Sequence, residues 1–177
     1  MIRIRNAAIA LAILTLAAPA GARNLPPAPA PVGHIVRHTN PPPAIILSGV
    51  TVPPGAETIY LSGQIASPID PAKTDSIEAF GDTRTQTISV LGKIRTLLAA
   101  QGYTMGDVIK LTAFVAGDPQ LGGKMDFAGF NAGYRQFFGT AENPNLVARS
   151  TVQVAALAGP NFLIEIEATA AKMPARR

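Results

Sequence analysis

Several residue types are scarce or absent in this sequence, and each absence excludes a kind of site. The 177 residues include no cysteine, which excludes disulfides, thiolate metal sites and a cysteine nucleophile. Histidine occurs only twice, at His34 and His38, so a zinc site made of three histidines is impossible. Charged residues are only 15% of the chain, against about a quarter in a typical soluble domain, and 47% of the residues are hydrophobic. A chain of this length and composition can bury the core of one domain.

The charge balance gives little indication of a nucleic-acid partner. The formal net charge is +4, from 15 basic and 11 acidic residues. Two of the basic residues, Arg3 and Arg5, lie in a segment that we expect to be removed. No basic stripe with interleaved aromatic residues follows, so we expect no nucleic-acid partner.

The N-terminal 22 residues have the pattern of a secretory signal peptide. Arg3 and Arg5 form a positive start, an apolar run covers residues 7–18, and Ala20-Gly21-Ala22 supplies the small-x-small pattern of a cleavage site. A membrane anchor is the alternative, but the apolar run is short for a span. The sequence therefore predicts cleavage after Ala22 and an exported, periplasmic or secreted protein.

Residues 23–43 are rich in proline, which favours extended chain over a helix or a central strand. This segment holds both histidines, which suit a solvated linker better than a metal site because no carboxylates accompany them. A docking peptide for another protein is a further hypothesis for residues 26–43. We predict a folded domain over residues 44–172 and a short basic tail over 173–177.

The folded domain alternates strand and helix patterns. Apolar runs at 44–50 and 58–62 flank a Pro-Pro-Gly turn and predict a hairpin. Apolar residues at steps of three and four predict helices from about Asp82 to Gln101 and over residues 124–138. Period-two patterns predict strands at 108–116, 147–156 and 162–170. The order β-β-α-β-α-β-β with both helices on one face of a mixed sheet predicts an α+β domain.

Pleat parity suggests which side chains share a face of the sheet. In the last two strands it places Ala148 and Ile166 on the helix face, and Arg149, Glu165 and Glu167 on the opposite face. An arginine fork matches a carboxylate in two parallel bonds, and a glutamate can orient or deprotonate a water. A structural arginine–glutamate pair across an oligomer interface is the alternative interpretation.

Three ordered motifs carry a family resemblance. The segments LSGQI at 61–65, ARSTVQV at 148–154 and LIEIEA at 163–168 resemble the RidA/YjgF family of reactive-imine deaminases. The resemblance extends over residues 45–171. It implies a chorismate-mutase-like fold and a homotrimer, with the helices outside and three clefts between the subunits.

The resemblance also implies a reaction and roles for individual residues. Members hydrolyse 2-imino acids, or their 2-enamino tautomers, to 2-keto acids and ammonia, with no metal or organic cofactor. Arg149 would hold the substrate carboxylate, and Glu165 would act on the catalytic water. The remaining cleft residues would be Ser62, Gly63, Asn131 and Thr151.

One position departs from the family pattern. Active members carry a tyrosine before the first strand that reaches the site, and the alignment places Ile46 there. This departure and the signal peptide indicate a divergent, exported member. A trimeric protein that binds a small carboxylate or a protein partner without catalysis is therefore the alternative function.

Overall fold

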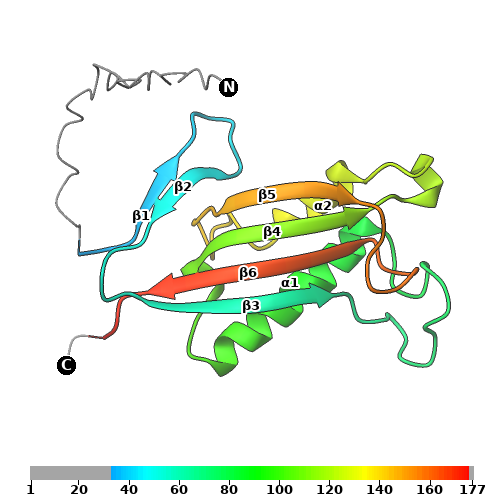
Figure 1. Ribbon diagram of the computed structural model, residues 1–177, viewed down its shortest axis with the longest axis horizontal. Helices are drawn as coiled ribbons and strands as arrows, with labels where there is room; N and C mark the ends of the chain where they lie inside the picture. The colour runs from blue at the N-terminus through cyan, green and yellow to red at the C-terminus, as the bar shows by residue number, and fades with distance from the viewer. Residues whose placement is uncertain (1–32, 176–177) are drawn as a thin grey trace, which may run out of the picture. The chain divides into compact units, whose positions relative to one another are not determined.

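The computed structural model describes residues 33–175, which all belong to one compact unit. The predicted signal peptide, residues 1–22, lies outside the described residues, as do residues 23–32 of the proline-rich segment. Two helices and six strands form the fold (Figure 1). Their bounds are β1 Val36–Thr39, β2 Leu47–Thr51, β3 Glu57–Ile65, α1 Thr83–Ala100, β4 Val108–Ala116, α2 Phe127–Tyr134, β5 Ala148–Val154 and β6 Ile164–Lys172.

The six strands form one mixed sheet in the order β1-β2-β5-β4-β6-β3. β4 and β5 run parallel, whereas β6 is antiparallel to both of its neighbours, β4 and β3. The predicted α+β class and its element order are confirmed, with one further strand, β1, ahead of them. The C-terminal strand β6 therefore lies inside the sheet and the N-terminal strand β1 at its edge (Figure 1).

The predicted hairpin between residues 44–50 and 58–62 is wrong. β2 pairs with β1 and β5, and β3 pairs with β6 on the far side of the sheet. The turn between β2 and β3 does form, with the Ala56 N–H donating to the Pro53 carbonyl oxygen at 3.3 Å and Gly55 at φ 82°. However, β3 matches the long alternating strand β6 along most of its length, and this pairing separates it from β2.

β1 lies within the proline-rich segment 23–43, so the sheet begins before residue 44. Its four residues contain no proline, and the prolines at 41–43 follow in the connection to β2. An edge strand leaves one row of N–H groups unpaired, which is why proline-rich sequence is tolerated beside it. Arg37 fastens the strand to the domain through donors to the backbone oxygens of Gly106, Val108 and Leu146 at 2.7 to 2.9 Å.

α1 begins and ends where the sequence predicts. The Asp82 carboxylate accepts from the Thr85 backbone N–H at 2.7 Å and caps the helix, which ends before Gln101. α2 is shorter than the predicted 124–138. Asp126 caps it by accepting from the Gly129 N–H at 2.8 Å, and the residues after Tyr134 continue as turns.

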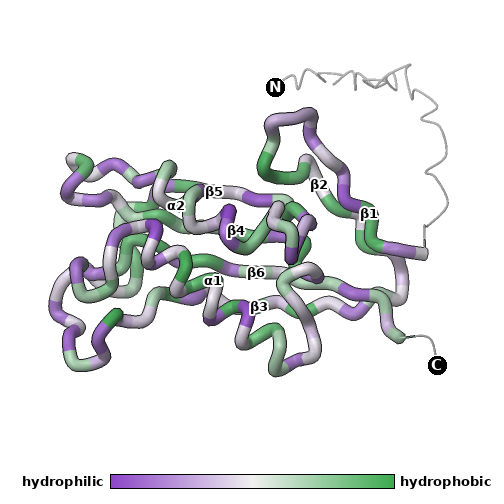
Figure 2. The backbone as a smooth tube through the Cα atoms, turned by 180° about the vertical axis from the view of Figure 1, so that it is seen from behind, coloured by the Kyte–Doolittle hydropathy of each residue, from purple (hydrophilic) through white to green (hydrophobic). Residues whose placement is uncertain are grey.

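The core lies between the sheet and the two helices. Its fully buried members come from every layer. They include Val90, Leu91, Ile94 and Leu98 from α1, Phe130 and Tyr134 from α2, and Leu111, Ala113, Ile164 and Ile166 from the sheet. Figure 2 views the molecule from the opposite side and shows polar and apolar stretches alternating along the chain. The sheet thus has one face covered by helices, here called the helix face, and an opposite open face.

Candidate functional site

Arg149, the second residue of β5, lies against helix α2. Its Nη2 donates to the Asn131 Oδ1 at 2.8 Å. Its Cζ lies 4.7 Å from the centre of the Phe130 ring and 4.5 Å from that of Tyr134. A third ring, Phe127, is 5.9 Å away. The guanidinium is therefore held by one hydrogen bond and by aromatic rings of a single helix.

The predicted face of β5 is wrong, and the sheet register shows why. Arg149 pairs with Leu111 of β4, and Thr151 pairs with Ala113. Leu111 and Ala113 are fully buried on the helix face, so their partners share that face. The prediction assigned the apolar residues of β5 to the core, yet Val152 is 46% exposed. The aromatic side of α2 accommodates a guanidinium where the sequence pattern suggested aliphatic packing.

Two buried polar atoms on this face lack a hydrogen-bond partner. They are the Nη1 of Arg149 and the Oγ1 of Thr151, two residues apart on β5. Within residues 33–175, no carboxylate forms an ion pair with Arg149. Burial lowers the pKa of Arg149 from its ordinary value, and the nearby Tyr134 opposes this effect. A half-buried guanidinium without a counter-ion, with a buried Nη1 beside an unpaired hydroxyl, is a complement for a small anion.

Tyr134, which is not among the predicted site residues, completes this cluster. Its hydroxyl donates to the Ile45 carbonyl oxygen at 3.0 Å, and its ring stacks on Phe138 at 4.9 Å. Burial raises the pKa of the Tyr134 phenol, with the charge of Arg149 acting in the opposite direction. The spacing of Phe127, Phe130 and Tyr134 along one helix face was the sequence feature that could have indicated a platform for the arginine.

The two glutamates lie on the other side of the sheet, as predicted. Glu165 of β6 pairs with Phe114 of β4 and with Ile65 of β3. A Cβ at Gly63 would collide with the Glu165 carboxylate. Gly63 therefore allows this carboxylate to lie against the β3 backbone, at the point where the β3–β6 register is irregular.

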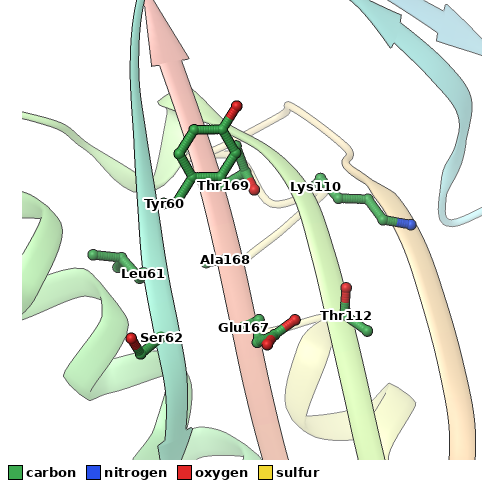
Figure 3. A pocket seen from close by; sticks show the side chains of 8 residues that line it. All are labelled: Tyr60, Leu61, Ser62, Lys110, Thr112, Glu167, Ala168 and Thr169. Atoms are coloured by element: carbon green, nitrogen blue, oxygen red, sulfur yellow. The ribbon is translucent and has the colours of Figure 1, made fainter.

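Glu167 lines a hollow of about 300 Å³ on the open face. Figure 3 shows its carboxylate pointing toward Thr112, with Ser62 across the hollow and Tyr60 above. Lys110 is at the rim and donates to the Ser150 hydroxyl at 2.8 Å. The hollow thus combines a carboxylate with hydroxyl groups and one cation.

The predicted site residues therefore form two groups within one chain. Arg149, Asn131 and Thr151 lie on the helix face, whereas Ser62, Gly63 and Glu165 lie toward the open face. The sheet separates the two groups, so a single chain does not present Arg149 and Glu165 to the same small ligand.

The strand edge beside Arg149 is largely unpaired. β2 meets β5 at one residue pair, Leu47 and Ala148, and then diverges from it (Figure 1). Residues 149–154 of β5 therefore have β4 on one side and no strand of the described part of the chain on the other. Ile46, which the resemblance aligns with the expected family tyrosine, packs partly buried against the core.

Residues 33–175 offer neither a cluster of metal ligands nor a membrane-spanning helix. This part of the chain holds no cluster of three or more histidine, aspartate or glutamate side chains arranged to ligate a metal ion. Neither of its helices has the length and apolarity needed to cross a membrane.

Comparisons with known proteins give a consistent result. The family model described as Endoribonuclease L-PSP matches residues 40–172. A 2-iminobutanoate/2-iminopropanoate deaminase of Escherichia coli is 39% identical over 114 residues, which cover 64% of this chain and 79% of the relative.

Solved structures extend the similarity to the fold. A protein of unknown function of the Rid family, YyfB from Yersinia pestis, superposes with a TM-score of 0.57 at 28% identity, covering 76% of this chain and 96% of its own. The YjgF product of Escherichia coli gives a TM-score of 0.50 at 36% identity, with 64% and 79% covered.

Proposed function

The chain belongs to the RidA/YjgF family and has its chorismate-mutase-like fold, and on this premise we propose that it is an imine deaminase. The proposed reaction converts 2-imino acids, or their 2-enamino tautomers, to 2-keto acids and ammonia. A relative at 39% identity is named for this activity, which supports the assignment at the level of the family.

The unpaired Nη1 of Arg149 is the observation that carries the proposal. Asn131 occupies one N–H of Nη2, which leaves N–H groups on both terminal nitrogens for the two oxygens of a carboxylate. Thr151 adds a hydroxyl from the same strand face. This set of donors suits one small carboxylate better than the repeated phosphates of RNA, the substrate class that the name of the matching family model suggests.

The chemistry requires only water as a second reactant. Protonation of the imine nitrogen makes its carbon electrophilic, and a water oxygen adds to that carbon as the C=N π electrons move to nitrogen. Proton transfer from the new hydroxyl to the amine then allows the C–N bond to break, which releases ammonia and forms C=O. Glu165 would accept a proton from the attacking water, and Glu167 is the alternative base.

A homotrimer with clefts between subunits would unite the two groups of residues. Arg149 and Glu165 lie on opposite faces of the sheet in one chain, so the proposal requires the open face of one copy to meet the β5 edge of another. Exposed apolar side chains on the open face support such a contact, with Tyr60 78% and Val152 46% exposed. Three copies would form three equivalent sites.

Export completes the proposal and has its own test. Residues 1–22 carry the signal-peptide pattern, and the proposed mature protein begins at Arg23. Intact mass measurement of the protein from a periplasmic fraction should give the mass of residues 23–177. A full-length mass in the cytoplasmic fraction would contradict export and leave the catalytic proposal unaffected.

The deciding experiment measures ammonia released from freshly generated 2-iminobutanoate above the spontaneous rate. Wild-type protein should give a clear excess, and Arg149→Ala should abolish it while remaining folded. Arg135→Ala is the matched control, because this exposed arginine follows the last residue of α2 and only its backbone N–H, which the substitution keeps, donates to the Asn131 carbonyl oxygen. Equal activity in wild type and Arg149→Ala would contradict the proposed role.

A binding protein without catalysis is the second candidate, and Ile46 is the observation that favours it. The side chain at the position of the family tyrosine has no hydroxyl to offer the ligand. Calorimetry with 2-ketobutyrate distinguishes the two functions. Binding that depends on Arg149, combined with ammonia release no faster than background, would support the second candidate.

A further inference from the structure

We propose that Tyr134 is a positioning residue for the arginine of the site: its ring fixes the plane of the Arg149 guanidinium and thereby directs Nη1 toward the ligand. For its enzymatic consequence, this inference rests on the proposed function. Its structural part concerns the guanidinium alone and is testable without any substrate.

The ring of Tyr134 is itself fixed on both sides. Its side chain is fully buried, and its hydroxyl donates to the Ile45 oxygen at 3.0 Å. On the ring, Phe138 stacks with centroids 4.9 Å apart and an interplanar angle of 23°. A ring held by a hydrogen bond at its tip and a stacked neighbour has little rotational freedom, so it is a rigid support for the group that lies on it.

Arg149 depends on this support because it has no ion pair among the described residues. Asn131 anchors one nitrogen through a 2.8 Å hydrogen bond, and one hydrogen bond leaves the fork free to turn about that contact. The Tyr134 ring, 4.5 Å from Cζ, and the Phe130 ring at 4.7 Å remove this freedom. The ring faces also stabilise a buried cation whose desolvation would otherwise be uncompensated.

The same contact joins the site to the segment before β2. The family resemblance places a tyrosine side chain at position 46, where this chain has Ile46. The preceding residue, Ile45, contributes its backbone carbonyl oxygen as the acceptor for the Tyr134 hydroxyl. The phenol thus links three elements, the segment before β2, helix α2 and strand β5, through one side chain.

The test uses variants that separate the ring from its surroundings. Tyr134→Met removes the ring face at similar volume, and Tyr134→Phe keeps the face but removes the hydroxyl. Phe138→Leu is the matched control, because it removes an aromatic ring that stacks on Tyr134 but not on Arg149, while the hydrogen bond to the Ile45 oxygen still holds the Tyr134 ring in place. All three substitutions are made in the full mature chain.

The first readout is rotation about the Cζ–Nε bond of Arg149, measured by NMR in the absence of ligand. We expect slow rotation in wild type, Tyr134→Phe and Phe138→Leu, and rotation at least about tenfold faster in Tyr134→Met. Equal rotation rates in Tyr134→Met and Phe138→Leu would overturn the inference, because Tyr134 would then be an ordinary core residue.

The second readout is the affinity for 2-ketobutyrate and the split between KM and kcat. Tyr134→Met should weaken binding about tenfold and raise KM in proportion, whereas Phe138→Leu should lower thermal stability without this change. Tyr134→Phe should restore binding to within about threefold of wild type. Equal losses of affinity in Tyr134→Met and Phe138→Leu would contradict a positioning role.

A substitution of similar shape covers the case in which Tyr134→Met does not fold. Fluorinated phenylalanine at position 134 preserves the packing but weakens the attraction of the ring face for a cation. The rotation rate of the Arg149 guanidinium should be higher in this variant than in Tyr134→Phe. An equal rate in the two variants would overturn the inference. If wild type binds no 2-ketobutyrate while these rotation rates differ as expected, the proposed function fails and the positioning role of Tyr134 stands.

Discussion

The two faces of the sheet differ in the surroundings of their charged side chains. On the helix face, Arg149 is embedded among aromatic and aliphatic side chains and has no carboxylate partner among the described residues. On the open face, Glu167 and Lys110 lie around a hollow with hydroxyl groups nearby. A charge that is both buried and unpaired is costly to fold around, whereas a half-exposed charge on a polar face costs little. This contrast indicates that a contribution to folding stability does not explain the presence of Arg149.

The largest expected effect tests the two faces as packing surfaces. Leu111 is fully buried on the helix face, and its neighbour Thr112 lines the hollow on the open face. Leu111→Ala should lower the free energy of unfolding by about 2–5 kcal/mol, and Thr112→Ala by about 0.5 kcal/mol or less. Urea unfolding at one fixed protein concentration measures both, and similar losses would mean that the open face is as tightly packed as the core.

The next effect isolates the buried charge. Arg149→Met replaces the guanidinium with an apolar chain of similar length, so the cost of burying an unpaired cation disappears. The free energy of unfolding should stay equal or rise by about 1 kcal/mol, while ligand affinity should fall by about 100-fold. Chemical unfolding and calorimetry with 2-ketobutyrate check the two parts. A marked loss of stability would show that the arginine serves the fold.

A smaller effect concerns the helix layer that creates the covered face. Asp82→Ala removes the cap of α1 and should cost about 1 kcal/mol at neutral pH. Hydrogen bonds from Thr85 lower the pKa of Asp82 below its ordinary value. Its contribution is therefore present above the ordinary pKa and is lost as the pH falls through the lower, folded-state pKa. Wild type and Asp82→Ala should converge in unfolding midpoint once the pH lies below the folded-state pKa of Asp82, and a difference that stays constant with pH would contradict the cap.

The smallest effect on stability concerns the open face. Gly63→Ala places a methyl group against the Glu165 carboxylate, which can move because it ends a flexible side chain. The free energy of unfolding should change by less than about 1 kcal/mol, but turnover should fall because the carboxylate is displaced. In a Glu165→Gln background, the same glycine substitution should cause little further loss of activity. If the two substitutions instead reduce activity by independent factors that multiply in the double variant, Gly63 does not act through Glu165.

Local periodicity predicted the parts of the fold that depend on nearby residues. The helix beginning near Asp82 and the alternating strands β4 and β6 follow from steps of three, four or two residues. The partners of β2 and β3 could not be predicted in this way, because β3 pairs with a strand at the far end of the chain. Local turn residues at 53–55 suggested a hairpin, and the long match with β6 determined the actual pairing.

The sequence predicted which residues form the candidate site, but only partly how their side chains are arranged. The motifs indicated Arg149 and Asn131, and the structure brings these two side chains into contact. The face of β5 was not predictable from polarity, since an exposed Val152 and a half-buried Arg149 with a buried Nη1 reverse the usual pattern. The aromatic rings of α2 that make this reversal possible become a platform only once helix and strand are packed together.

The position of β6 in the sheet has a consequence for how the chain is made. Of the six described strands, β6 is synthesised after the other five, yet it lies between β3 and β4. Until residues 164–172 have been synthesised, both of those strands lack a neighbour and α1 has no complete surface to cover. Contacts between such distant parts of a chain form slowly. The described sheet can therefore be completed only after residues 164–172 have been synthesised.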